Sequence, residues 1–199
     1  MLRAVEHIRR ARGGSQAQVM RTDDGELYLL KLQNNPQGTK VLANELLACR
    51  LARKLGLPVP EPAVIELDEA TIRDQNISFI LGGRNLAPRA GLQFLEWSFP
   101  DSPLRGTYPK NSVYDKICGW DDFEPWLSRI ERFPEQDLFA AADDIPPEWY
   151  DGDREALDRL LESLLNRRLI VRDLIDSFRV SHRNPFTNWG VAFPAAAAA

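Results

Sequence analysis

Alternating apolar and polar positions predict a β-hairpin early in the chain. Residues 26–33 read ELYLLKLQ and give the strongest strand pattern, while residues 16–21 give a weaker one. The tetrapeptide TDDG at 22–25 stands between them. Aspartate side chains form local hydrogen bonds and glycine accepts a positive φ, so this tetrapeptide predicts a tight turn.

Helical spacing follows the hairpin. Apolar residues recur three and four positions apart over residues 39–55, and Gly56, Pro58 and Pro60 end the pattern. Thr39 is a candidate cap for the start of this helix. Residues 6–12 form either a short helix or an extended arm. Further short strands are predicted at residues 63–67, 76–81 and 90–94, with a Gly82-Gly83 turn after the second.

The later part of the chain has helical periodicity and long loops. Residues 153–169 give the clearest helix, which Asp153 can cap. Residues 121–131 and 170–180 predict two more helices. Residues 96–109 contain three prolines and suit neither helix nor strand. The apolar stripe of the clearest helix consists of Leu157, Leu160, Leu161, Leu164 and Leu165.

Composition divides the chain near Phe94. Residues 1–94 carry 13 basic and 10 acidic side chains, whereas residues 95–199 carry 12 and 19 together with 15 of the 18 aromatic residues. We therefore predict an α+β fold in two parts. The first domain, residues 1–94, has an antiparallel sheet and a helix, and residues 95–194 are mainly helical. The alanines at 195–199 carry no functional information, and we expect that they are not native.

Charge and cysteine content narrow the class of protein. A net charge of −4 argues against a strongly basic nucleic-acid binder. The two cysteines, Cys49 and Cys118, cannot make a disulfide framework or a four-ligand zinc site by themselves. No secretory segment follows Met1 and no apolar run approaches about 18 residues, so we expect a cytoplasmic protein without membrane contact. Four arginines near the start of the chain could still contact nucleic acid locally, although an exposed face of the protein is the simpler interpretation. They are Arg3, Arg9, Arg10 and Arg12.

Three features of the first part together suggest phosphate binding. They are the loop Gly13-Gly14-Ser15, the strand lysine Lys31 and the helix glutamate Glu45. Glycines let backbone N–H groups approach phosphate oxygens, the lysine supplies positive charge, and the glutamate can hold the ammonium in place. Each feature alone has an ordinary explanation as a loop, a solvated strand residue or a surface charge. Their order and spacing favour the strand-lysine and helix-glutamate arrangement of protein kinases.

The segment with these features resembles the N-terminal lobe of the HipA-like kinase family, bacterial proteins related to the HipA toxin, a serine/threonine kinase. The resemblance covers residues 6–94, through GGSQAQVMRTDDGELYLLKLQNNPQGTKVLANELLACRLARKLGLPVPEPAVIEL. The later segments EWSFPDSPLRGTYPKNSVYDKICGWDDFEPWLSRIE and LLNRRLIVRDLIDSFRVSHRNPFTNWG look like the family's C-terminal region. The resemblance implies a two-lobed protein-kinase-like fold that binds ATP between its lobes.

The resemblance also implies roles for particular residues. Lys31 and Glu45 would be the catalytic lysine–glutamate pair, and Gln93 and Phe94 would lie near the hinge that meets the adenine. The implied ATP-binding residues are Gly13, Gly14, Ser15, Lys31, Gln93 and Phe94.

One departure from the family pattern is large. The family has a long additional stretch between its GLQF segment and its EWSFPDSPLRG-like segment, and this stretch carries the catalytic-loop and metal-binding aspartates. Here GLQF continues directly into LEWSFPDSPLRG, so the helical part is incomplete and we assign no metal ligand. Either the natural protein lacks the stretch, or it contains the stretch and the present sequence does not.

Two functions follow from the resemblance. The leading one is an ATP-binding HipA-like protein that transfers a phosphoryl group to serine or threonine with Mg²⁺, if the natural protein contains the missing stretch. The alternative is a pseudokinase that acts as a partner-binding or regulatory module. The implied partners are a nucleotide and a protein substrate or antitoxin-like protein.

Overall fold

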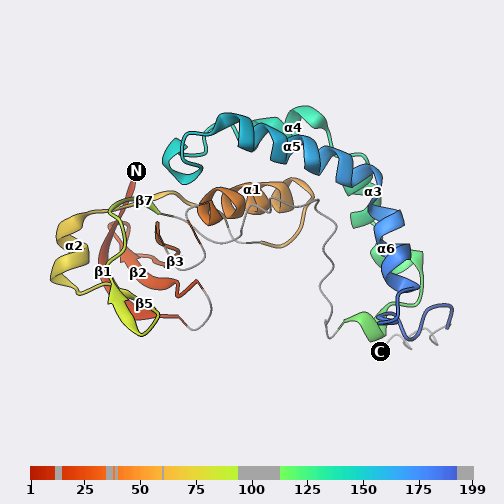
Figure 1. Cartoon of the computed structure of the whole chain (residues 1–199), viewed down its shortest axis with the longest axis horizontal. Coiled ribbons are helices and arrows are strands. Elements are labelled where there is room, and N and C mark those ends of the chain that lie inside the picture. Colours follow the sequence, from red (N-terminus) through yellow and green to blue (C-terminus); the bar gives the residue numbers. More distant parts are fainter. Residues whose placement is uncertain (12–14, 35–37, 39, 60, 94–112, 192–199) are drawn as a thin grey trace. The chain divides into compact units, whose positions relative to one another are not determined.

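The computed structural model describes residues 1–11, 15–34, 38, 40–59, 61–93 and 113–191 (Figure 1). The chain forms two compact units, each described by itself below. The first unit comprises Met1–Phe99 and Gln136–Leu160, and the second comprises Pro100–Glu135 and Leu161–Ala199. The segment Gln136–Leu160 thus packs with the predicted first domain, whose boundary at residue 94 stays a prediction.

The first unit contains a five-stranded mixed sheet. Strand β1 pairs with β2 in antiparallel fashion and with β4 in parallel fashion, so the prediction of an antiparallel sheet is wrong at this one junction. No local sequence pattern indicates this pairing, because it joins residues more than sixty positions apart. The strand order is β3-β2-β1-β4-β7, with β1 (Leu2–Arg10), β2 (Gln18–Thr22), β3 (Leu27–Leu30), β4 (Ile65–Leu67) and β7 (Gly91–Gln93).

The hairpin predicted over residues 16–33 is present, as is the strand predicted before the Gly82-Gly83 turn. β2 and β3 pair around the 22–25 turn, where Asp24 Oδ1 accepts from the backbone N–H of Glu26 at 3.0 Å. A separate hairpin joins β5 (Phe79–Leu81) and β6 (Arg84–Leu86) through the two glycines predicted to turn. Of the two forms expected for residues 6–12, a helix or an extended arm, residues 6–10 take the extended one as part of β1.

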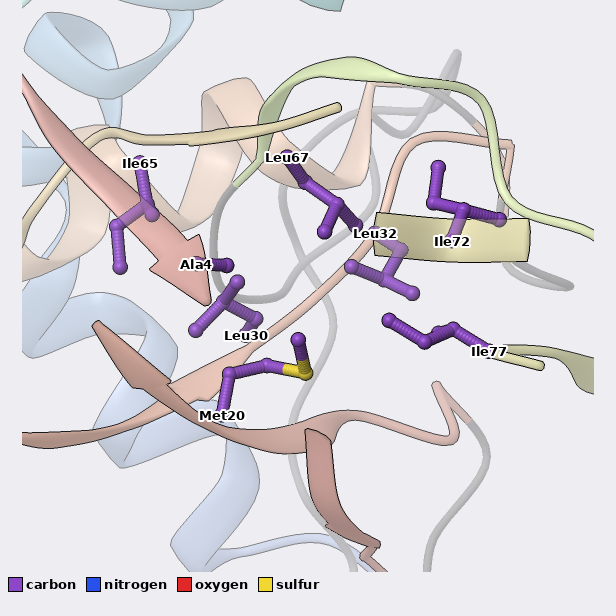
Figure 2. Packing of buried hydrophobic residues seen from close by; sticks show 8 residues of the cluster. All are labelled: Ala4, Met20, Leu30, Leu32, Ile65, Leu67, Ile72 and Ile77. Atoms are coloured by element: carbon purple, nitrogen blue, oxygen red, sulfur yellow. The ribbon is translucent and has the colours of Figure 1, made fainter. Parts of the chain in front are cut away.

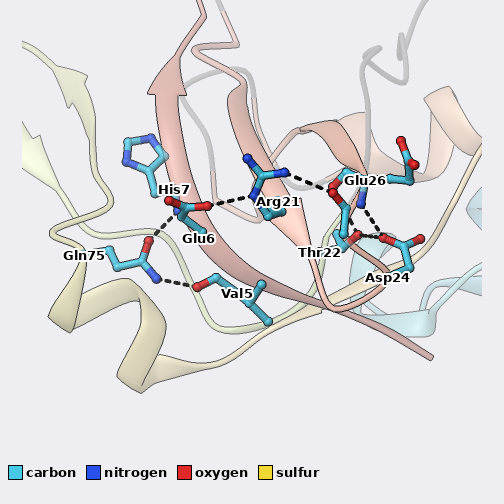
Figure 3. Close-up of polar contacts among 9 residues, drawn as sticks. Val5, Glu6, His7, Arg21, Thr22, Asp24, Glu26 and Gln75 are labelled. Carbon is cyan, nitrogen blue, oxygen red and sulfur yellow. Dashed lines mark hydrogen bonds and ion pairs between the residues drawn. The ribbon is translucent and has the colours of Figure 1, made fainter.

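Strand β1 is irregular, and side chains from elsewhere complete its hydrogen bonds (Figure 3). Register shifts interrupt its pairing with β2 on either side of Glu6 and His7. The amide of Gln75 spans the irregular stretch, because it donates to Val5 O at 2.8 Å and accepts from the backbone N–H of His7. Glu6 also pairs with Arg21 on β2, at 2.8 Å. Gln75 therefore supplies hydrogen bonds to the β1 backbone at Val5 and His7, on either side of Glu6.

Two helices belong to this part of the unit. Helix α1 (Val41–Lys54) ends as predicted at Gly56, whose φ of +80° suits glycine and whose N–H bonds to Arg53 O. The residue at its N-cap is Lys40, and the predicted cap Thr39 lies outside the described residues. The short helix α2 (Glu69–Asp74) was not predicted, although Asp68 caps it by accepting from Thr71 N at 2.7 Å.

A hydrophobic core lies against one face of the sheet (Figure 2). It draws on four strands (β1, β2, β3 and β4), the segment after β3, helix α2 and the segment after α2. Burial of each such side chain contributes roughly 1.5–3 kcal/mol, so this cluster fixes the position of the segment after β3. Its buried members are Ala4, Met20, Leu30, Leu32, Ile65, Leu67, Ile72 and Ile77.

The segment Gln136–Leu160 contains most of α4 (Glu135–Ala140), a 3₁₀ turn (Pro147–Trp149) and the start of α5 (Arg154–Leu169). The helix predicted at 153–169 is confirmed, including its cap, because Asp153 Oδ1 accepts from Ala156 N at 2.9 Å. Polar bonds attach this segment to α1 and β7, as described below.

The second unit is built around aromatic rings. Tyr114, Phe123, Phe178 and Phe186 pack edge to face with ring centroids 5.5 to 5.8 Å apart. The helix predicted at 170–180 is confirmed as α6 (Val171–Arg179).

The helix predicted at 121–131 in this unit is only partly correct. A 3₁₀ turn (Trp120–Phe123) precedes α3 (Trp126–Glu131), and Glu124 between them is extended. Pro125 explains the break, because proline lacks an N–H and disfavours helical geometry in the residue before it. No helix in the described part of the chain is long and apolar enough to cross a membrane.

Candidate functional site

Lys31 and Glu45 meet, as the sequence predicted. Lys31 follows directly after β3, one residue beyond the observed end of the strand, and Glu45 lies in the second turn of α1. Lys31 Nζ is 3.7 Å from Glu45 Oε1, and the two side chains are only 5% and 14% exposed. A buried charge is costly unless it is paired, so each side chain depends on the other. The ion pair is thus confirmed, while its role with ATP stays a prediction.

The sequence around the pair explains its geometry. Leu32 is buried in the core below the sheet, which fixes the backbone on which Lys31 is carried. In α1, Leu42 and Leu46 are buried on either side of Glu45 in sequence, so the helix presents this face to the interior. The pair is therefore held by apolar packing on both elements.

Cys49 lies one helical turn after Glu45. Burial raises the pKa of the Cys49 thiol, the negative charge of Glu45 raises it further, and the positive charge of Lys31 partly opposes this. A raised pKa leaves the thiol protonated at neutral pH, so Cys49 is a poor nucleophile. Burial likewise raises the pKa of Cys118, with a further contribution from Asp122. Neither cysteine is placed for catalysis.

The predicted nucleotide loop is only partly visible. Gly13 and Gly14 lie outside the described residues, and Ser15 is buried with 6% of its surface exposed. Immediately after it, the amide of Gln16 donates to Ile80 O at 2.6 Å and accepts from Ile80 N at 2.7 Å. The base of the loop is thereby attached to β5. The contact of this loop with phosphate stays a prediction.

The predicted hinge residue Gln93 lies on β7 and is fully buried. Its amide nitrogen donates to Arg89 O at 2.7 Å and Gly91 O at 3.1 Å, and its amide oxygen accepts from Gln33 N. The Gln93 side chain is therefore committed to internal bonds, so if this strand is the hinge, its backbone is the part left to contact an adenine. The hinge role itself stays a prediction. Phe94 lies outside the described residues.

Two residues of this region were missed from the sequence. Leu92 O, on β7, accepts from Gln33 Nε2 at 2.9 Å and from Trp149 Nε1 at 2.8 Å. Both donors are buried, and Trp149 is completely so. Gln33 could have been noticed as a polar residue ending an apolar run. Trp149 had no such signal, because its contact spans 57 positions.

Among the residues that the structure describes, the other titratable side chains form no second cluster of this kind. His7 Nε2 is 2.8 Å from Gln18 Oε1, and His182 is exposed. Asp176 pairs with Arg179 at 2.7 Å, as expected for a surface charge. Among the residues described, no group of three or more His, Cys, Asp or Glu side chains could hold a metal ion.

Comparison with known proteins gives a match over the segment that contains the Lys31–Glu45 ion pair. Residues 4–86 match the family model described as HipA-like kinase. This segment is therefore similar to HipA-like kinases. The match confirms the resemblance over 83 of the 199 residues, and it includes Ser15, Lys31 and Glu45 but ends before Gln93. No curated protein and no solved structure matches the chain. The mixed sheet and its helix are consistent with a kinase-like fold.

Proposed function

We propose that this HipA-like protein binds ATP at the first compact unit, with Lys31 beside the phosphates. The single observation that supports this most is the buried Lys31–Glu45 ion pair inside the segment that matches HipA-like kinases. In protein kinases, a strand lysine held by a helix glutamate contacts the nucleotide phosphates. The pair here has the residue types, the order along the chain and the contact that this task needs.

The two side chains would divide the work. The Lys31 ammonium is a compact positive charge that attracts phosphate oxygens, and its fixed position lowers the entropy lost on binding. Glu45 would keep that ammonium from turning away. Magnesium normally accompanies ATP and spreads the charge of the phosphates. We assign no ligand of this chain to magnesium.

Direct binding tests this proposal. We expect ATP to raise the melting temperature of the wild-type chain, because a ligand at 100 times its Kd adds about 2.7 kcal/mol to the free energy of unfolding. Lys31→Met should weaken ATP binding at least about 10-fold, as removal of a charged partner costs several kcal/mol. Lys116→Met is the matched control, since the Lys116 side chain is 71% exposed and pairs with the adjacent Asp115. Equal ATP affinity for wild type and Lys31→Met would overturn the role of Lys31.

Whether the protein is a kinase or a pseudokinase depends on the stretch absent after GLQF. We propose serine/threonine phosphoryl transfer for a natural protein that contains it, and a partner-binding or regulatory role for one that does not. The intact mass of the native protein distinguishes the two forms, since the present sequence corresponds to 22.6 kDa. Transfer of labelled γ-phosphate from Mg-ATP to the protein itself or to a substrate would exclude the pseudokinase.

A further inference from the structure

Strand β7 is held from outside the sheet. It pairs with β4 on one side, and Leu92 is the middle residue of its three. The Leu92 carbonyl accepts two side-chain hydrogen bonds, from Gln33 Nε2 at 2.9 Å and from Trp149 Nε1 at 2.8 Å. Each additional hydrogen bond to a half-buried carbonyl limits how far that part of the backbone can shift. Three residues of paired strand are thus fixed by donors far away in sequence.

Trp149 is well suited to fix a backbone position. Its ring is completely buried, so the indole N–H has one direction in which to donate. It ends the 3₁₀ turn Pro147–Trp149, where its own backbone N–H bonds to Pro146 O at 3.0 Å. The donor is therefore anchored through its backbone as well as its ring.

The segment that carries Trp149 is also attached to α1. Arg50 Nη1 donates to Ala141 O at 2.8 Å, and the same guanidinium forms a two-pronged ion pair with Asp144. Lys54 Nζ is 2.8 Å from Asp137 Oδ1. One segment, residues 137–149, thus holds both β7 and the helix that carries Glu45. We call these residues the brace.

We infer that Trp149 is a positioning residue for base recognition, because it fixes the β7 backbone that would read the nucleotide base. This inference rests on the proposed binding of ATP. It adds that the brace, which follows residues 94–112 in sequence, belongs to the nucleotide-binding unit. The two residues would have different roles: Lys31 determines the affinity for the phosphates, and Trp149 determines the discrimination among bases.

Comparison of ATP with GTP separates these roles, since the two ligands share a triphosphate and differ only in the base. Trp149→Phe keeps most of the ring and removes the N–H donor. We expect Trp149→Phe to lower the ratio of ATP affinity to GTP affinity roughly fivefold, which is the effect of one lost hydrogen bond. Lys31→Met should weaken both ligands and leave the ratio unchanged. Trp126→Phe, a half-buried tryptophan of the second unit, is the matched control and should change neither affinity.

A second variant protects the test against misfolding. Gln33→Met removes the other donor to Leu92 O and should narrow the ratio in the same way. Thermal unfolding of each variant gives the temperature at which it begins to unfold, and the nucleotide titrations are done below that temperature. If wild type binds no nucleotide, the proposed function itself fails. If wild type prefers ATP and both variants keep its ratio, or weaken both ligands equally, Trp149 is only a structural residue and the inference is wrong.

Discussion

The buried ion pair allows a quantitative prediction about stability. We consider three variants: Lys31→Met, Glu45→Leu, and the double variant that combines these two changes. Each single change leaves one charged or polar group in a buried place without the partner that compensates its lost hydration. The double change removes both groups and replaces them with apolar side chains of similar size.

The separation of the charges sets the size of the effect. At 3.7 Å, and with an effective dielectric constant of about 20, the attraction between Lys31 and Glu45 is about 4 kcal/mol before the cost of desolvation. We therefore expect Lys31→Met to lower the free energy of unfolding by about 3 kcal/mol, and the double variant to lie within about 1 kcal/mol of wild type. Since domains of this kind are stable by roughly 5–15 kcal/mol, the loss is readily measured.

Urea unfolding of wild type and the three variants gives the coupling energy between the two sites. We expect a coupling of at least about 2 kcal/mol, because neighbouring charges that share a buried site are not additive. Arg3→Met with Glu66→Leu provides the exposed control, since that pair is 66% and 41% exposed and should couple by less than about 1 kcal/mol. A coupling below about 0.5 kcal/mol between positions 31 and 45 would refute the buried pair and the reasoning built on it.

Three further results are expected. Gly91→Ala should lower the free energy of unfolding in urea by about 1–3 kcal/mol, because φ at this position is +119° and the new Cβ would lie 3.2 Å from Gln33 Nε2. An unchanged urea midpoint would contradict this prediction. Asp153→Ala should lower the free energy of unfolding by about 1 kcal/mol, and Asp153→Asn by much less, since asparagine can also cap the start of α5. Equal losses in the two variants would exclude a capping role for Asp153. Hydrogen bonding from Arg50 lowers the pKa of Asp144 below its ordinary value of 3.8. The contribution of Asp144 to the free energy of unfolding is therefore complete above pH 3.8 and is lost as the pH falls through the lower pKa of the folded state. Asp144→Asn should remove this acid-dependent part of the free energy of unfolding, measured as a function of pH.

Local features of the first part were predictable from the sequence. The hairpin around residues 22–25, the end of α1 at Gly56 and the meeting of Lys31 with Glu45 all follow from patterns within about 35 residues. Strand alternation, a turn and a helix stop signal act over short distances, and they leave few ways to place the lysine relative to the helix.

Contacts between distant segments were not predictable. The parallel pairing of β1 with β4 and the bond from Trp149 to Leu92 join residues far apart in sequence, and no local pattern indicates either. Helix α2 was missed for a different reason, because its six residues are too few to show helical periodicity. The break at Pro125 could have been predicted, since proline inside a helical pattern usually ends it.

The central position of β1 has a consequence for how this chain emerges from the ribosome. The meander of β1, β2 and β3 joins residues at most about 20 positions apart, so it can form soon after residue 30 is made. The other edge of β1 must wait for Ile65, which pairs with Leu2. During that interval the nascent chain presents a bare strand edge, which is a template for association with other chains. The yield of folded protein should therefore depend on how quickly translation passes from residue 30 to residue 67.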